Sequence, residues 1–137
     1  MICDLANNVK IVNALDVTAI SSDTTTSGAV IDTKGFGSGA VLVRVSAFTD
    51  GSYIINMQEG DAANLSDAAD IPAARIIGTA QALTAVDESD KIGFLCNKRY
   101  VRVQVDSTST STGASLLGNC ILGHPDSGPV GTHSITA

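Results

Sequence analysis

Apolar and polar residues alternate with a period of two along much of this chain. In the stretch 40–48 the valines fall on one face and more polar side chains on the other. Such alternation is typical of a β-strand that buries one face. The turn signal Asp50-Gly51 separates this stretch from a second alternating stretch, 53–58. We therefore predict that the two stretches form an antiparallel hairpin.

A third alternating stretch runs from Tyr100 to Asp106 and is followed by the polar tract 107–112 and Gly113. This tract has the composition of a turn, so we predict a second hairpin whose return strand spans 114–122. The residues expected to be buried are the valines of the two clearest strands: Val41, Val43, Val45, Val101, Val103 and Val105. Arg44, Arg102 and Gln104 should face water or a partner.

Weaker strand candidates are 9–20, 29–33 and 92–96, while the Ala-rich stretch 61–69 is expected to be a loop with one helical turn. Many short strands without alternating helices favour an all-β fold, an antiparallel β-sandwich or a jelly-roll-like arrangement of two packed sheets.

The chain divides at residue 123. We expect residues 1–123 to form a single β domain, because 137 residues suit one domain with its own core. Residues 124–137 contain two prolines and two glycines, which predicts an irregular, extended C-terminal arm that orders against a neighbouring subunit.

Composition narrows the classes of partner. Apolar residues make up 44% of the chain, yet only 4% of residues are aromatic, so the core should be aliphatic. The net charge of −6 speaks against nucleic acid and anionic membranes as partners. No apolar run is long enough to predict a membrane segment or a signal peptide. Three cysteines do not form a disulfide framework, and synthesis in a reducing compartment is expected.

Candidate chemistry is sparse. Cys96, Cys120 and His124 would supply three zinc ligands if their strands lay side by side, but a fourth ligand is missing. The acidic cluster at 87–90 lacks the ligand spacing of a calcium loop and is expected to be a solvated turn. Gly35-Phe36-Gly37-Ser38-Gly39 precedes a strand rather than a helix, so it predicts a turn and not a phosphate-binding loop. We expect no enzymatic activity, no cofactor and no metal.

One basic segment, 98–102, departs from the acidic average. On a strand, Tyr100 and Arg102 share a face, and these residue types are enriched at protein interfaces. The alternative is a solvated strand edge protected by its charges. The candidate partner interface comprises this segment and part of the C-terminal stretch: Arg99, Tyr100, Arg102, His124, Pro125 and His133.

Five segments together resemble a known family. They are Ala29-Val30-Ile31-Asp32-Thr33-Lys34-Gly35-Phe36, Thr49-Asp50-Gly51, Ile76-Ile77-Gly78-Thr79 before Leu83, Lys98-Arg99-Tyr100-Val101-Arg102-Val103, and Ile121-Leu122-Gly123-His124-Pro125. In order and spacing they are similar to small proteins encoded beside the major capsid gene of tailed phages and prophages.

The resemblance implies a capsid cement, or decoration, protein with a jelly-roll-like β fold. Such a protein is made in the bacterial cytoplasm and ends on the outer surface of the phage head in the virion. There it binds the major capsid protein of an HK97-type shell and clamps neighbouring subunits. We expect the chain to bind itself as well, with a dimer favoured over a trimer.

Two other functions remain open at this stage. A minor head-to-tail connector would share the β character but occur in few copies per particle. A carbohydrate- or host-surface-binding module would need exposed aromatic side chains, which this sequence offers sparingly.

Overall fold

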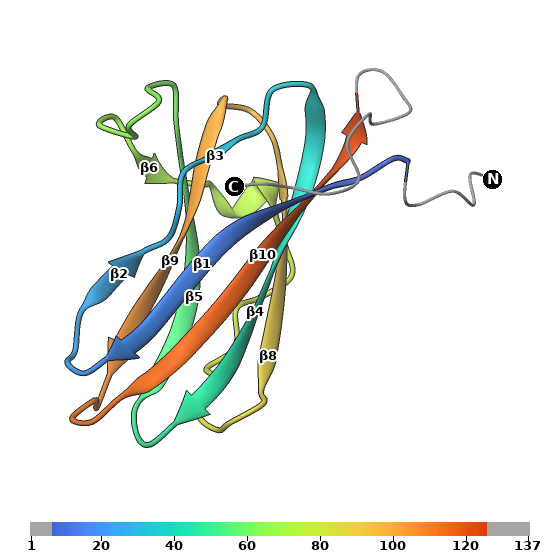
Figure 1. Cartoon of the computed structure of the whole chain (residues 1–137). Coiled ribbons are helices and arrows are strands. Elements are labelled where there is room, and N and C mark those ends of the chain that lie inside the picture. Colours follow the sequence, from blue (N-terminus) through green and yellow to red (C-terminus); the bar gives the residue numbers. More distant parts are fainter. Residues whose placement is uncertain (1–6, 126–137) are drawn as a thin grey trace.

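The computed structural model describes residues 7–125, which fold into two antiparallel β-sheets packed face to face (Figure 1). The prediction of an all-β sandwich is confirmed. Its elements are β1 (Lys10–Ile20), β2 (Thr25–Ser27), β3 (Ile31–Asp32), β4 (Phe36–Phe48), β5 (Ser52–Gly60), β6 (Ala69–Asp70), the 3₁₀ turn η1 (Ala73–Arg75), β7 (Ile76–Ile77), β8 (Ser89–Leu95), β9 (Tyr100–Thr108) and β10 (Ala114–Pro125).

Sheet A has the strand order β1-β10-β4-β8-β7, and sheet B has the order β2-β9-β5-β6 with β3 also paired to β9. Both predicted hairpins are therefore wrong. The strand β4 lies in sheet A while β5 lies in sheet B, and β9 and β10 are likewise divided between the sheets. Alternation fixes which face of a strand is buried, but two consecutive strands can bury those faces against each other across the core as well as side by side.

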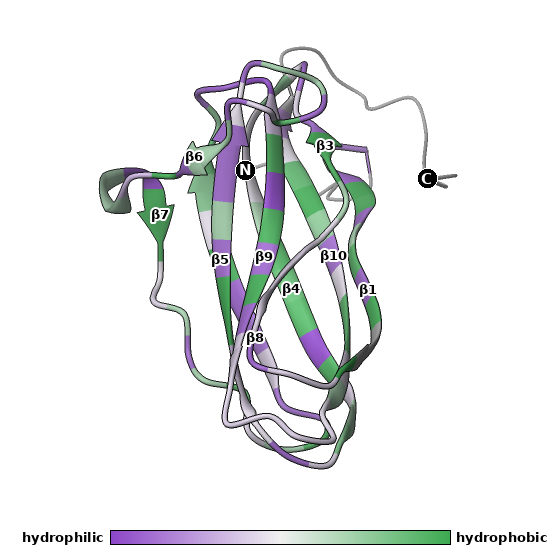
Figure 2. Cartoon of the chain, turned by 90° about the vertical axis from the view of Figure 1, so that its left-hand side faces the viewer, coloured by the Kyte–Doolittle hydropathy of each residue, from purple (hydrophilic) through white to green (hydrophobic). Residues whose placement is uncertain are grey.

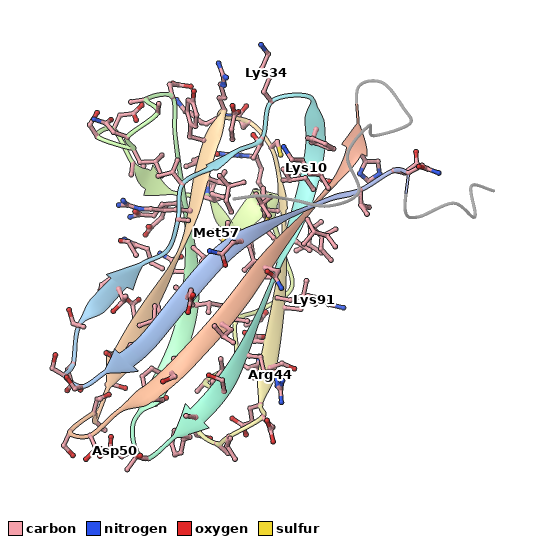
Figure 3. All side chains as sticks on the ribbon, viewed as in Figure 1. Lys10, Lys34, Arg44, Asp50, Met57 and Lys91 are labelled. Carbon is pink, nitrogen blue, oxygen red and sulfur yellow. The ribbon has the colours of Figure 1, made fainter. Side chains whose placement is uncertain are left out.

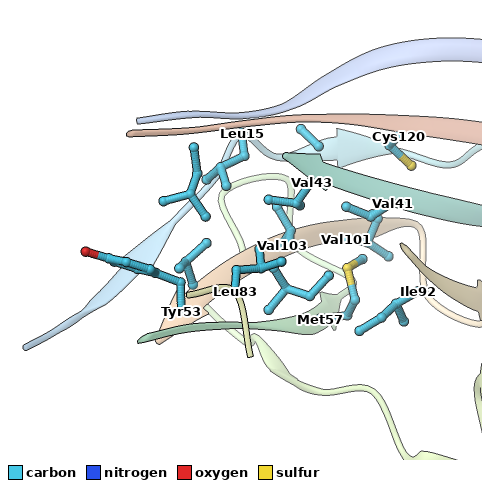
Figure 4. Packing of buried hydrophobic residues seen from close by; sticks show 14 of the residues in the cluster. Leu15, Val41, Val43, Tyr53, Met57, Leu83, Ile92, Val101, Val103 and Cys120 are labelled. Carbon is cyan, nitrogen blue, oxygen red and sulfur yellow. The ribbon is translucent and has the colours of Figure 1, made fainter. Parts of the chain in front are cut away.

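The core lies between the sheets and is almost entirely aliphatic, as predicted (Figure 4). All six valines expected inside are at most 1% exposed. Tyr53 and Phe94 are fully buried among them, and the Tyr53 hydroxyl donates to the Asp50 carbonyl oxygen over 2.8 Å. Figure 2 shows the alternation that produces this burial, since hydrophilic and hydrophobic positions follow one another along β9.

Two of the loops that cross between the sheets are tied together at one end of the sandwich. Asp50, between β4 and β5, accepts hydrogen bonds from the backbone N–H groups of Ser111, Thr112 and Gly113, between β9 and β10. Gly51 has a φ of 100°, which is accessible to glycine and strained for other residues. The Asp-Gly signal therefore marks a crossover held by a side chain rather than a hairpin turn.

Both long sides of the sandwich are closed by contacts between the sheets. On one side, Gly28 donates its N–H to Val103 of sheet B and Ala29 donates its N–H to Ala14 of sheet A. On the other side, Arg75 forms an ion pair with the buried Glu59 of β5 and donates to the Leu95 carbonyl oxygen of β8. Partners therefore have two outer faces and two ends of the sandwich to contact.

The remaining predictions about elements have mixed outcomes. The stretch 61–69 contains turns without a helix, and the 3₁₀ turn follows later, at Ala73–Arg75. Strand β10 continues to Pro125, two residues into the segment predicted as an arm. Proline lacks an N–H, and Pro125 pairs with Phe36 of β4, three residues beyond Leu122, which pairs with Lys10 of β1. Residues 126–137 lie outside the described residues.

Candidate interaction surfaces

The outer face of sheet B is polar, and its side chains are hydrogen-bonded to one another. Arg102 donates to the Gln58 side-chain oxygen over 3.0 and 2.8 Å, and Gln58 in turn donates to Asp70 over 3.3 Å. Asn56 donates to the same carboxylate over 3.0 Å. Strand β9 is paired on both sides, so Arg102 does not protect a strand edge, and that interpretation is wrong. This face is a ladder of polar groups that are hydrogen-bonded to one another.

Arg99 and Tyr100 lie at the end of the sandwich where β9 begins. Arg99 binds both oxygens of Asp32 through its Nε and Nη2 atoms, over 3.0 and 2.9 Å, and its guanidinium carbon lies 5.1 Å from the centroid of the Tyr100 ring. The guanidinium lowers the pKa of Asp32 chiefly through these hydrogen bonds. The pair is about half exposed, so it orients Arg99 more than it stabilises the fold.

A shallow hollow of about 370 Å³ opens beside Arg99. The buried Thr33 holds its two rims together, because the Thr33 hydroxyl is within 3.2 Å of the Lys98 carbonyl oxygen and 2.8 Å of the Arg99 carbonyl oxygen. The lining residues come from the loop before β4, the first residue of β4, and the loop between β8 and β9: Thr33, Lys34, Gly35, Phe36, Cys96, Asn97, Lys98 and Arg99.

His124 and Pro125 reach the same end of the sandwich on β10. The His124 Nδ1 atom lies 2.6 Å from the Ser38 hydroxyl oxygen, and Pro125 pairs with Phe36, which lines the hollow. His124 has a φ of 51°, an uncommon value for a residue other than glycine. The structure thus brings together four predicted partner residues here and places Arg102 further along β9. His133 lies outside the described residues.

The charges of the described residues are unevenly divided between the two ends. Strand registers place six basic and five acidic residues in the half of the sandwich that contains Phe36, Tyr100 and Pro125, which we call the basic end. The other half, the acidic end, holds seven acidic and two basic residues. Figure 3 shows Lys10 and Lys34 toward the first end and Asp50 at the second. The molecule therefore has an electrical polarity along its long axis.

The carboxylates at the acidic end are engaged by the protein's own groups. Asp87 pairs with Arg44 over 2.5 Å, and Glu88 accepts the N–H groups of Thr84 and Ala85. Hydrogen bonds from the Ser111 hydroxyl and from the Thr112 and Gly113 N–H groups lower the pKa of Asp50 to about 2. These carboxylates order loops and do not converge on a common point.

The outer face of sheet A carries an apolar row, and the sequence analysis missed it. One row of outward positions crosses all five strands with no charged side chain: Ile11, Ile121, Ala40, Gly93 and Ile77. Ile11 is 48% exposed and Ile77 61% exposed, and two exposed leucines, Leu42 and Leu95, flank the row, while the exposed Leu117 lies one row further along β10, beyond Asn119. The uninterrupted apolar run Cys120-Ile121-Leu122 is the signal for a strand that is apolar on both faces.

The thiols of Cys96 and Cys120 are free. Burial raises the pKa of Cys120 to about 12 and also raises that of Cys96, so both thiols stay protonated near neutral pH. Among residues 7–125, no three His, Cys, Asp or Glu side chains are grouped to hold a metal ion.

No protein-family model matches the chain, and none of the curated proteins matches it. Within the described part of the chain, no helix is long and apolar enough to cross a membrane.

Proposed function

We propose that this protein is a phage-head cement protein that binds the outside of an HK97-type shell and clamps neighbouring major capsid proteins. The observation that carries the proposal is the convergence of Arg99, Tyr100, His124 and Pro125 on one end of a rigid sandwich. These residues were selected from the sequence as an interface. We include in this proposal that the sandwich has the jelly-roll-like connectivity of that family.

The basic end suits a contact with another protein. Its arginine is already held by Asp32 and stacked near Tyr100, so little side-chain entropy is lost when it meets a partner. Tyr100 and Arg99 offer the apolar surface and the planar donor that interfaces favour. A lattice repeats such a contact many times, so a modest affinity per copy stabilises a whole shell.

The aromatic side chains argue against a carbohydrate-binding module. Tyr53 and Phe94 are fully buried, and Phe36, Phe48 and Tyr100 are each partly buried. Sugar platforms need ring faces that are open to solvent. A connector remains the competing function, and copy number separates it from cement.

Rebinding to stripped heads tests the proposal. Purified protein should bind heads that lack it in a fixed ratio to the major capsid protein and raise the temperature at which the heads release their DNA. Arg99→Glu should weaken binding about tenfold or more, because it places a repelling charge beside Asp32 at the contact.

The control is Thr108→Glu, which adds a carboxylate to the exposed outer face of sheet B at the acidic end, away from Arg99 and from sheet A. It should bind heads as the unmodified protein does. Equal binding by all three proteins would remove the basic end from the mechanism. A few bound copies per head would favour the connector.

A further inference from the structure

The apolar row on the outer face of sheet A is too regular to be a scatter of exposed side chains. The four strands β1, β10, β4 and β8 lie about 4.8 Å apart and carry outward rows about 6.8 Å apart, so four rows span on the order of 500 Å², with the apolar row among them and polar side chains in the rows beyond Leu42. That area per partner is at the lower limit of the interfaces that form stable, specific complexes. Single exposed apolar residues need no explanation, whereas an apolar row that crosses a whole sheet, with exposed leucines beside it, points to a docking site.

The sizes of the side chains on this face are complementary across its centre. Ile121 on β10 is paired in register with Ala40 on β4. A two-fold axis that runs along the strands, between β10 and β4, would place Ile121 of each copy over Ala40 of the other. A bulky side chain then meets a small one twice, as close packing of two sheets requires.

The charges beside the row are complementary under the same operation. Asp16 is exposed on β1, whereas Arg44 and Lys91 are exposed on β4 and β8. The axis between β10 and β4 places β1 of one copy over β8 of the other. Asp16 of one copy therefore lies one row from Lys91 of the other, within reach of that long side chain, and by symmetry this happens at both sides of the interface.

We propose that the outer face of sheet A binds a second copy of this chain, forming a two-fold dimer through Ile121, Ala40 and the leucines around them. The polar outer face of sheet B, where side chains are paired with one another, stays exposed to water. The inference does not depend on capsid binding, since it concerns the purified protein alone.

The dimer has a consequence for the two ends of the sandwich. A two-fold axis parallel to the strands leaves both basic ends pointing in the same direction. One dimer would thus present two copies of the Arg99 surface side by side. If the basic end binds capsid protein, this arrangement bridges two neighbouring subunits, and the second contact is strengthened by the first.

Sedimentation equilibrium on the full-length protein tests the proposal. The unmodified chain should have twice its chain mass of 13.9 kDa at micromolar concentration. Ile121→Lys and Ala40→Glu should each raise the dissociation constant about tenfold or more, because each buries a charge against an apolar partner. The matched control is Ile54→Lys, since Ile54 is 43% exposed on the outer face of sheet B, and it should remain dimeric.

Far-ultraviolet circular dichroism of each variant shows whether a lost dimer results from unfolding. Leu42→Lys, at a position that is 40% exposed, serves as a third substitution on the same face. A chain that sediments as a monomer, or a dimer that survives both Ile121→Lys and Ala40→Glu, overturns the proposal. The proposal is also overturned if the unmodified protein is a monomer and its Ile121→Lys variant no longer binds heads, because the outer face of sheet A would then bind capsid protein.

Discussion

At the scale of single residues, burial on one face of each strand determines most of the stability. Val103 is fully buried between the sheets, on a strand that is paired on both sides. Replacing it with aspartate places an unpaired carboxylate in an aliphatic core and should cost several kcal/mol, against a total stability of about 5–15 kcal/mol.

We therefore expect Val103→Asp to lose the cooperative thermal transition, measured by circular dichroism. Thr108→Asp is the control, since Thr108 is exposed near the end of the same strand, and it should melt as the unmodified protein does. A normal melting curve for Val103→Asp would contradict the observed burial.

Asp50 gives the stability a defined dependence on pH. Its pKa is about 2 in the folded protein, against about 3.9 in an unfolded chain. Because folding lowers this pKa, the contribution of the carboxylate is complete above about pH 4 and is lost as the pH falls toward about 2. Asp50→Asn should lower the melting temperature at pH 7 but not at pH 2, and a constant difference between the two proteins at both values would exclude this role.

Alternation was sufficient to predict the buried face of residues such as Val41 and Val101, because the pleat of a strand directs every second side chain inward. It was not sufficient for the outward faces. Ile121 and Ile77 come from strands that are distant in sequence, and only the register of sheet A places them in one row. Similarly, Arg99 and His124 were selected as separate candidates, and the fold brought them to one end.

At the scale of elements, the segment around Gly28 joins the two sheets. A Cβ atom at Gly28 would lie 2.1 Å from the Ala14 carbonyl oxygen, so any side chain pushes the segment away from β1. The hydrogen bonds from Gly28 to Val103 and from Ala29 to Ala14 would then be strained or lost.

Gly28→Ala should therefore destabilise the fold by about 2–4 kcal/mol in urea denaturation. Gly37→Ala is the matched control, because a Cβ atom there makes only ordinary contact with His124, at 3.4 Å. Equal stability of the two variants would show that the segment around Gly28 can move away from β1 without lowering the free energy of unfolding.

The partners of strands were the part of the fold that local sequence could not predict. The turn at Asp50-Gly51 was correctly located, whereas the turn predicted from residue 107 begins only after Thr108, because β9 continues to that residue. Whether a turn joins neighbours in one sheet or crosses between sheets depends on contacts distant in sequence, such as those from Asp50 to the loop at 111–113. Turn composition alone does not contain that information.

At the scale of the whole molecule, the two faces and the two ends have different properties. The outer face of sheet A carries an apolar row, that of sheet B a ladder of paired polar groups, and the charges are divided between a basic and an acidic end. A dimer through sheet A would align two basic ends, and each could contact one capsid subunit. This division of surfaces is what a clamp between repeated subunits requires.

A density map of the assembled phage head tests this account most directly. The account predicts paired β-sandwich densities on the outside of the shell, repeated in a fixed ratio to the major capsid protein. The end that contains Arg99 and His124 should face the shell, with the outer faces of sheet A in contact within each pair. A shell without such density, or a single copy at one vertex, would contradict the account.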